Sequence, residues 1–246
     1  LGTGAMWGIT LRDFVLDLFE ELSGGRIYHM YIIPGGVRRD LPPGFAERVL
    51  SVLGTIEERL PEFDRLILNN SVFKDRTMGV GTVKPEWVDE LGLVGPVARG
   101  SGSELDIRRD HPYEAYGDLD FDVVTEQGCD IYSRALARRR EIDLSISLIR
   151  QVLDRMPGGP VATALPNLTE WKIPPGEVYS RVESSRGEYG YYVVSDGGTR
   201  PRRVHVRGPS YVHAITLLER MLVGANIADV SNIMVSLTTC PPEIER

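Results

Sequence analysis

Few residues of this chain could carry redox or metal chemistry, and the most unusual of them stands close to the C-terminus. Cys240 is followed by Pro241, Pro242 and Glu243 in a tail that has no apolar period to explain a cysteine there. A thiolate is the preferred ligand of soft transition metals, whereas a carboxylate is a hard ligand. Composition alone leaves two interpretations of Cys240 open, a ligand and an ordinary free thiol, and it favours the free thiol.

A second candidate group lies in a turn between two segments that alternate like strands. Arg186 stands in the sequence Ser184-Ser185-Arg186-Gly187 and is followed by Glu188. Taken by itself, an arginine in such a turn is interpreted as a surface charge. In a poorly solvated cavity the same guanidinium would hold a developing negative charge.

The sequence lacks the common motifs of enzymes. There is no dinucleotide fingerprint, nucleophile elbow, HExxH or CxxC motif, and RTMGVGTV at residues 76–83 lacks the lysine and hydroxyl residue of a phosphate loop. Cys129 lies in a helical pattern and is predicted to be a small core residue. The four histidines are isolated in the sequence, which favours structural or surface roles; they are His29, His111, His205 and His213.

The element expected to organise these residues is a long helix predicted over residues 127–156. Its apolar residues recur at helical spacing, and more of its charges stand in the first half than in the second. The second half is apolar on more than one side, so we expect it inside a helical bundle. The sequence PGGP at 157–160 should end the helix, because proline lacks an amide donor and glycine accepts the left-handed cap.

The other segments are expected to pack on this helix. Residues 177–183, 189–195 and 202–207 alternate as strands between short polar turns, which predicts an antiparallel meander. Segment 26–33 is expected to be β-like, and 95–122 is expected to be a long loop over a site. Helices are predicted over 11–22, 43–60, 63–73, 87–91, 210–223 and 228–237, with Pro61 ending the second. The predicted fold class is α+β, a central helical bundle around one long helix with a small antiparallel meander.

Composition excludes several classes of function. The 246 residues have a net charge of −7 and are 42% hydrophobic, enough to bury the core of a single domain over 1–246. No global basic surface would attract nucleic acid, and the arginines at 138–140 and 200–203 form local clusters. No apolar run reaches the roughly eighteen residues that span a bilayer. Two cysteines without a signal-peptide pattern indicate a reducing, cytoplasmic compartment.

Several distinctive blocks, in order over nearly the whole chain, carry a resemblance to a known family. They are RIYHMYIIPGGVRRDLP (26–42), RTMGVGTV (76–83), GPVARGSGSELDIRRDHPYEAYGDLDFDV (95–123), GCDIYSRALAR (128–138), GEVYSRVESSRGEYGYYVVSDGGTRPRRVHVRGPSY (176–211) and EIER (243–246). Together they resemble the large subunit shared by respiratory complex I, as its 49 kDa or D-type subunit, and the membrane-bound nickel-iron hydrogenases. The resemblance implies a hydrogenase large-subunit-like α+β fold, a partner small subunit with a proximal [4Fe-4S] cluster, and a membrane arm.

The tail distinguishes the branches of this family. Its hydrogenases end in Cys-x-x-Cys-Thr followed by an acid and arginine, and a second cysteine pair near the N-terminus completes a four-thiolate nickel-iron site. Aligned by Glu245 and Arg246, Cys240 takes the first cysteine position and Glu243 the second. We therefore expect no nickel-iron centre and no other firmly bound cofactor or metal in this chain. One retained cysteine is similar to archaeal complex-I-like enzymes such as the membrane-bound sulfane sulfur reductase.

The resemblance also implies candidate site residues. The hydrogenase pattern glutamate, alanine, proline, arginine, glycine, glutamate matches Glu183, Arg186, Gly187 and Glu188, with serines in place of alanine and proline. The matching arginine lies beside the metal in hydrogenases, so Arg186, Glu188 and Cys240 are the candidates for lining an acceptor cavity beside the cluster-bearing partner. The histidine and tyrosine at the complex I quinone headgroup belong to an N-terminal part outside this chain, which is expected to be the C-terminal two thirds of a longer subunit.

Two functional interpretations follow. In the first, the chain belongs to an oxidoreductase subunit, active only within a complex, that passes electrons from the iron-sulfur small subunit to quinone or a sulfur compound. In the second, the cavity is vestigial and the subunit is a scaffold between its small subunit and other hydrophilic-arm and membrane-arm subunits. A nickel-iron hydrogenase is a third, weaker interpretation. The expected location is the cytoplasmic face of the membrane, held by partner subunits, and nucleic acid is not an expected partner.

Overall fold

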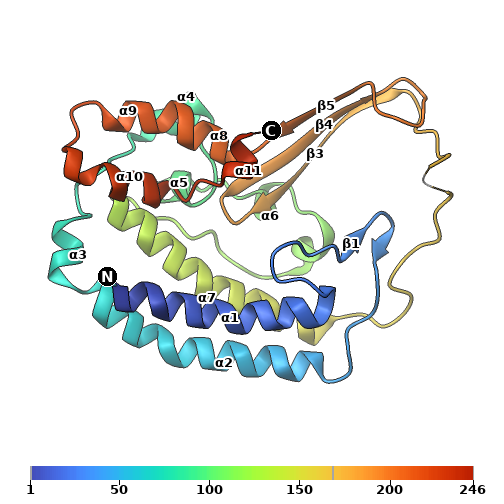
Figure 1. Cartoon of the computed structure of the whole chain (residues 1–246), viewed down its shortest axis with the longest axis horizontal. Helices are drawn as coiled ribbons and strands as arrows, with labels where there is room; N and C mark the ends of the chain where they lie inside the picture. Colours follow the sequence, from blue (N-terminus) through green and yellow to red (C-terminus); the bar gives the residue numbers. More distant parts are fainter. Residues whose placement is uncertain (1, 168, 246) are drawn as a thin grey trace. The chain divides into compact units, whose positions relative to one another are not determined.

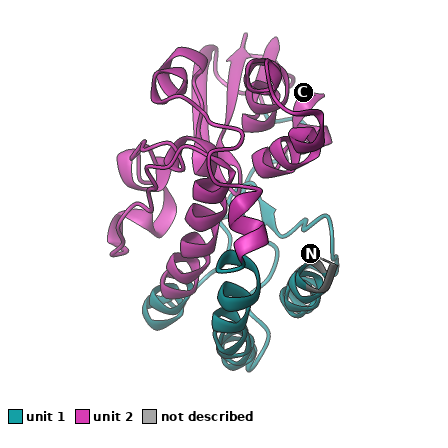
Figure 2. Ribbon diagram, turned by 90° about the vertical axis from the view of Figure 1, so that its left-hand side faces the viewer, with its two compact units in different colours: residues 1–70, 149–171 teal, residues 71–148, 172–246 magenta. Residues whose placement is uncertain are grey.

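The computed structural model describes residues 2–167 and 169–245 of the chain. It divides into two compact units, shown in two colours in Figure 2: unit 1 contains residues 1–70 and 149–171, and unit 2 contains residues 71–148 and 172–246. Helices are combined with two small antiparallel sheets, which confirms the α+β class. The assignment of a single domain over 1–246 stays a prediction.

Unit 1 is built on two helices, α1 (Gly2–Ser23) and α2 (Phe45–Phe63), which lie side by side (Figure 1). Between them is a mostly apolar cavity of about 250 Å³. Its lining residues are Trp7, Thr10, Leu11, Phe14, Thr55, Arg59 and Phe63. The expectation that Pro61 ends the second helix is wrong, because Pro61 lies inside α2 and the chain continues directly into a π-helix, η1 (Asp64–Leu68). Proline removes one amide donor, and the wider π turn that follows accommodates this loss without a break.

The predicted β-like segment at 26–33 is reduced to its last two residues. Strand β1 (Ile32–Ile33) pairs with β2 (Gly36–Val37) in a two-stranded hairpin. The residues before β1 form turns instead, in which Tyr31 N–H donates to the carbonyl of His29 at 2.8 Å. On its other side Gly36 bridges to Ala162, where a Cβ at Gly36 would lie 2.3 Å from the carbonyl of Val161. The apolar side chains that precede the hairpin remain exposed, and Ile32 itself is 83% exposed.

The long helix α7 spans Ile131–Arg155, so the predicted start at residue 127 is four residues too early. Cys129 has a φ of 62°, which no helix interior accepts, and Asp130 then receives hydrogen bonds from the backbone and hydroxyl of Ser133 at 2.8 and 2.9 Å. The predicted burial of the second half is confirmed only in part: Ile146 and Leu148 are buried, whereas Ile142 is 41% exposed and Ile149 is 38% exposed.

Unit 2 has its own apolar core, formed by short helices that pack on the first half of α7. They are α4 (Pro85–Leu91), α5 (Gly95–Arg99), the π-helix η3 (Val212–Leu217), α9 (Leu218–Leu222) and α10 (Val230–Leu237). The core residues are Val83, Val88, Leu93, Val97, Ala98, Ile131, Leu217, Met221, Ile233 and Leu237. The turn formed by 3-10 helix η4 (Ile227–Asp229) leads into α10, and α3 (Ser71–Asp75) opens the unit. The helices predicted over 87–91, 210–223 and 228–237 are thereby confirmed within a few residues.

The segment predicted as one loop over 95–122 contains three short helical pieces. Besides α5 they are α6 (Ile107–Asp110) and the 3-10 helix η2 (Glu114–Asp118). The side chain of Asp106 caps α6 by accepting from the backbone N–H of Arg108 at 3.0 Å. Local capping of this kind converts a polar stretch into ordered structure, and the loop prediction is wrong to that extent.

The predicted antiparallel meander is confirmed. Strands β3 (Gly176–Ser184), β4 (Gly187–Ser195) and β5 (Arg203–Arg207) pair in the order β3-β4-β5 and form the long sheet seen in Figure 1. Ser184 pairs with Gly187, so Ser185 and Arg186 form a two-residue turn. The short helices α8 (Pro209–Tyr211) and α11 (Pro241–Ile244) pack together near this turn. No helix within the described residues is long and apolar enough to cross a bilayer.

Candidate functional site

The turn that carries Arg186 is fixed by a close backbone contact with α5. Gly95 has a φ of 65°, and a Cβ on it would lie 2.3 Å from the carbonyl oxygen of Arg186. Gly187 makes the reciprocal approach, because its own Cβ would lie 2.6 Å from the side chain of Val94. Only glycine allows two backbones to lie this close. Gly95 and Gly187 therefore allow the turn to pack directly against α5.

Thr238 places two guanidinium groups beside one residue. Its carbonyl accepts a hydrogen bond from Arg186 Nε at 2.6 Å, and its hydroxyl accepts one from Arg138 Nη2 at 3.0 Å. Thr238 follows the last turn of α10 with a φ of 51°, an uncommon left-handed conformation for a β-branched residue. The end of α10 therefore positions one arginine from the meander and one from α7.

The C-terminal tail joins the same cluster. Ser210 at the start of α8 donates its hydroxyl proton to the Glu243 carboxylate and accepts a hydrogen bond from the backbone N–H of Cys240 at 3.0 Å. The other oxygen of Glu243 lies 3.8 Å from Arg186 Nη1. The structure thus brings Arg186, Cys240 and Glu243 into one neighbourhood, with the thiol of Cys240 unpaired and partly exposed.

Glu188, the remaining candidate, is directed elsewhere. Its carboxylate receives hydrogen bonds from Tyr179 Oη at 2.6 Å and from Arg181 Nη1 at 3.2 Å. Burial, aided by the hydrogen bond to Glu188, raises the pKa of Tyr179. Glu188 is the cross-strand partner of Glu183, so the two carboxylates lie on the same face of the meander. The catalytic role assigned to Glu188 from the resemblance stays a prediction.

A buried ionic network was not predicted from the sequence. Arg99 is 2% exposed and contacts three carboxylates: Glu141 at 2.8 Å, Glu183 at 2.8 Å and Asp106 at 3.6 Å. Burial alone would lower the pKa of Arg99, but the carboxylates outweigh it and the pKa is raised. Burial raises the pKa of Glu183 against the opposing effect of Arg99. The network fixes β3 to α5 and α7, and so supports the turn that carries Arg186.

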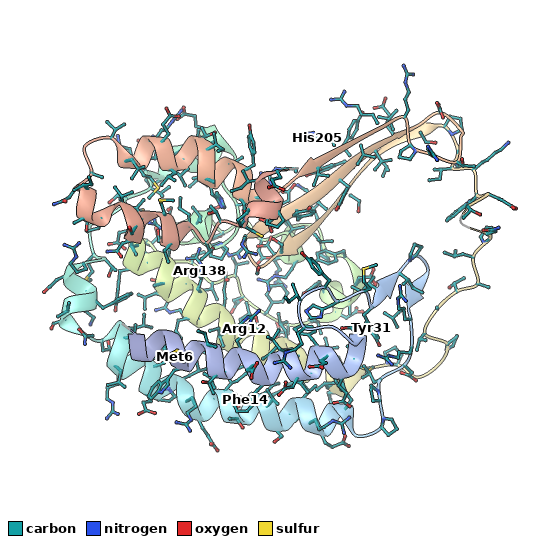
Figure 3. The ribbon with its side chains drawn as sticks, viewed as in Figure 1. Met6, Arg12, Phe14, Tyr31, Arg138 and His205 are labelled. Atoms are coloured by element: carbon teal, nitrogen blue, oxygen red, sulfur yellow. The ribbon has the colours of Figure 1, made fainter. Side chains whose placement is uncertain are left out.

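A second group missed by the sequence analysis contains Arg134, Arg138 and His213. Arg134 and His213 are fully buried, and Arg138 lies on α7 where Figure 3 labels it. Burial is the main cause that lowers the pKa of Arg134 to about 9 and that of Arg138 to about 10. Burial, with Arg138 as the largest charge effect, lowers the pKa of His213 to about 3. The sequence did contain a signal for this group: Arg134 and Arg138 are four positions apart in a helix, so they lie on one face, and the buried Ala137 is next to them.

The absence of a nickel-iron centre stays a prediction, and the chemistry of the donors in this chain supports it. Such a site takes soft thiolates, whereas the 246 residues contain two cysteines. Cys129 is buried at the start of α7 and hydrogen-bonds to the carbonyl of Gln127 at 3.4 Å, as predicted for a core residue. At the second position of the tail, the Glu243 carboxylate accepts a hydrogen bond from Ser210 and lies 3.8 Å from Arg186 Nη1. Within the described residues no group of three or more His, Cys, Asp or Glu side chains is arranged to hold a metal ion.

Comparison with known sequences gives matches over the whole chain. The family model described as respiratory-chain NADH dehydrogenase, 49 Kd subunit, matches residues 1–246. The D-type subunit of NADH-quinone oxidoreductase from Thermosipho melanesiensis is 42% identical over 248 residues, covering 100% of this chain and 68% of that protein. The D-type subunit of F(420)H(2) dehydrogenase from Methanosarcina mazei is 38% identical, covering 98% of this chain and 65% of that protein.

Comparison with solved structures gives the same result for the fold. A chain in the structure of the membrane-bound sulfane sulfur reductase, an archaeal respiratory membrane complex, matches with a TM-score of 0.93 and 41% sequence identity. The match covers 98% of this chain and 66% of that chain. The chain therefore spans about two thirds of the length of the relatives that it matches.

Proposed function

The chain belongs to the family of the 49 kDa subunit of respiratory-chain NADH dehydrogenase, and from this premise we propose that it is part of an electron-transferring subunit of a membrane-associated, complex I-like oxidoreductase. Its relatives are named for NADH and quinone, for F(420)H(2) and for sulfane sulfur. In the proposal, electrons arrive from a [4Fe-4S] cluster in a partner small subunit and leave to a quinone or a sulfur compound. Other partner subunits hold the chain at the cytoplasmic face of the membrane.

The observation that carries the proposal is the convergence of Arg186, Cys240 and Glu243 at the end of α10. Arg186 keeps 32% of its side-chain surface exposed, so one side of the guanidinium remains accessible. The separation of 3.8 Å from Glu243 is too long for a hydrogen bond, and that contact leaves donors of Arg186 available. A free thiol stands beside them in Cys240.

The chemistry of acceptor reduction suits such a group. A quinone takes up two electrons and two protons to become a quinol, and negative charge develops on its oxygen before the protons arrive. A sulfur–sulfur bond that takes up two electrons likewise leaves negative charge on sulfur. A preorganised guanidinium with an accessible donor face stabilises that charge, and in a poorly solvated site this effect is large.

Replacing Arg186 in the intact complex tests the proposal. Arg186→Ala should lower turnover on the order of 10²-fold, the typical cost of losing one preorganised donor, while the subunit composition stays unchanged. Cys240→Ser should have a smaller effect, because no metal is expected to be bound by Cys240. Arg203→Ala is the matched control, since Arg203 is an exposed arginine on β5 of the same sheet. Normal acceptor reduction in Arg186→Ala, with the complex assembled, would contradict the proposal.

A scaffold without catalysis is the second candidate, and one observation favours it. Arg186 Nε is committed to the carbonyl of Thr238 at 2.6 Å, which is a structural use of the guanidinium. If this use were the whole role, Arg186→Ala would reduce the amount of assembled complex, and turnover per assembled complex would stay at the wild-type value. Measuring both quantities on the same preparation separates the two functions.

A further inference from the structure

Two neighbouring side chains of unit 2 lack the hydrogen-bond partners that their burial demands. Neither ring nitrogen of His213 has a partner, and the buried Nε of Arg138 is unpaired as well. These are three of the four unpaired buried side-chain nitrogen and oxygen atoms found among the described residues. Buried polar atoms are nearly always satisfied in folded proteins, so such a group indicates that a water or an ion completes it.

The same neighbourhood is short of negative charge. Within the described part of the chain, Arg134 and Arg138 make no ion pair. Arg134 donates to the carbonyls of Gly81 and Cys129 and to Ser236 Oγ, at 2.9 to 3.2 Å. Arg138 donates to the carbonyl of Arg134 at 3.1 Å and to Thr238 Oγ1. Neutral acceptors satisfy some of the donors but do not neutralise the two charges, and a buried charge without a paired counter-charge is costly.

The nearest carboxylates do not remove this excess. Glu141 faces Arg138 and favours its charged form, but Glu141 is paired with Arg99 at 2.8 Å. Glu243 lies 3.8 Å from Arg186 and accepts from Ser210. Asp130 favours the charged form of Arg134, but its carboxylate already accepts from the backbone of Gly79 and from Ser133. Three guanidinium groups, those of Arg134, Arg138 and Arg186, thus face two carboxylates, Asp130 and Glu243, that are not already paired with another arginine.

The geometry also provides access and hydrogen-bond donors. Thr238 holds Arg138 through its hydroxyl and Arg186 through its carbonyl, so the two guanidinium groups lie around one residue. Arg138 and Arg186 are both partly exposed, whereas His213 is fully buried and close enough to Arg138 for that charge to lower its pKa. Near neutral pH the imidazole is uncharged, and an uncharged imidazole has one N–H donor.

We propose that Arg138, Arg186 and His213 form a binding site for a small anion, an oxyanion or sulfur anion with at least two acceptor atoms. In this site the Arg138 guanidinium donates to two acceptor atoms of the anion. The partly exposed Arg186 donates from the solvent side, and the buried His213 donates its one N–H. The identification of this anion with the acceptor or its reduced product rests on the proposed function. The site itself rests on the unpaired atoms and on the local excess of positive charge.

Binding of [³⁵S]sulfate to the purified intact complex at low ionic strength tests this site. Sulfate is a redox-inert oxyanion, and equilibrium dialysis gives the number of ions bound per complex. We expect Arg138→Gln and Arg186→Gln each to lose one bound sulfate, or to weaken it at least tenfold. Arg140→Gln should bind like the wild type, because Arg140 is an exposed arginine of the same helix, paired with Glu126 at 2.6 Å.

The outcomes separate this inference from the proposed function. Undiminished sulfate binding in either assembled variant overturns the anion site, including the case in which a carboxylate of a partner subunit already occupies it. If Arg138→Gln fails to assemble, the Arg186→Gln measurement decides alone. Lower turnover with undiminished sulfate binding leaves the proposed function standing without the anion site. Lost sulfate binding with normal turnover supports the anion site and contradicts the proposed function.

Discussion

The contact between Gly95 and the Arg186 turn can be tested by adding one methyl group. In Gly95→Ala the new Cβ would lie 2.3 Å from the carbonyl oxygen of Arg186 and 2.5 Å from Cα of Gly187. Both neighbours are backbone atoms, so no side-chain rotation relieves the contact. The turn between β3 and β4 would have to move away from α5, and the hydrogen bond from Arg186 to Thr238 would be disturbed.

The expected loss of stability in Gly95→Ala has two parts. An alanine held at a φ of 65° costs about 1–2 kcal/mol because its conformation is left-handed. Overpacking against fixed atoms adds about 1–3 kcal/mol. Gly79 isolates the first part, since its φ is 68° and a Cβ there meets no atom within 4 Å. The difference between Gly95→Ala and Gly79→Ala should therefore be about 1–3 kcal/mol, or roughly 5- to 150-fold in an equilibrium constant.

Hydrogen exchange of the intact complex, read by mass spectrometry, measures this difference locally. Peptides that cover the turn at 183–190 should exchange faster in Gly95→Ala than in Gly79→Ala by that factor, and turnover should fall in Gly95→Ala. Peptides of the β4–β5 connection at 196–202 serve as an internal reference. Equal protection of the turn in the two variants would refute the argument that the backbone approach at Gly95 holds Arg186 in place.

Three further predictions concern metal content, the buried network and pH. Metal analysis of the intact complex should find no stoichiometric nickel, because Glu243 replaces a thiolate; one nickel per large subunit would contradict this. Arg99→Ala should destabilise the subunit by about 3–5 kcal/mol in thermal or denaturant unfolding, because it leaves buried carboxylates uncompensated, whereas exposed Arg140→Ala should cost under about 1 kcal/mol. The pKa of His213 is about 3 in the folded state and 6.5 unfolded, so the unfolded chain binds more protons between these values. Stability present above pH 6.5 should be lost as the pH falls toward 3, by up to about 1.4 kcal/mol per pH unit, and His213→Leu should flatten this slope; equal slopes would show that His213 does not titrate on unfolding.

The parts of the fold that local pattern determines were predicted well. The meander follows from alternation and turn residues, and both act within a few positions of the chain. The end of α7 at Arg155 agrees with the helix-ending sequence at 157–160. Family resemblance, rather than pattern, singled out Arg186 and Cys240, and the structure places both in one neighbourhood with Glu243.

The parts that depend on distant partners could not be predicted. The sequence showed a cluster of arginines in the first half of α7 but not their partners: Arg134 is buried and contacts Ser236, and Arg138 contacts Thr238, about a hundred positions away in sequence. The apolar second half suggested burial, yet Ile142 and Ile149 remain exposed in this chain. In both cases the periodicity of the helix was interpreted correctly, and the environment of each face was set by elements that periodicity does not reveal.

Thr238 places backbone preference and side-chain chemistry in conflict at one position. Glycine would adopt a φ of 51° without strain and would relieve about 1–2 kcal/mol, so selection for stability alone favours its appearance there. Glycine would keep the carbonyl that binds Arg186 but lose the hydroxyl that orients Arg138. The strained threonine lowers the stability of the α10 terminus. In exchange, it keeps the guanidinium groups of two arginines in fixed positions. Across homologues, the choice between threonine, serine and glycine at this position would record which of the two demands each lineage has kept.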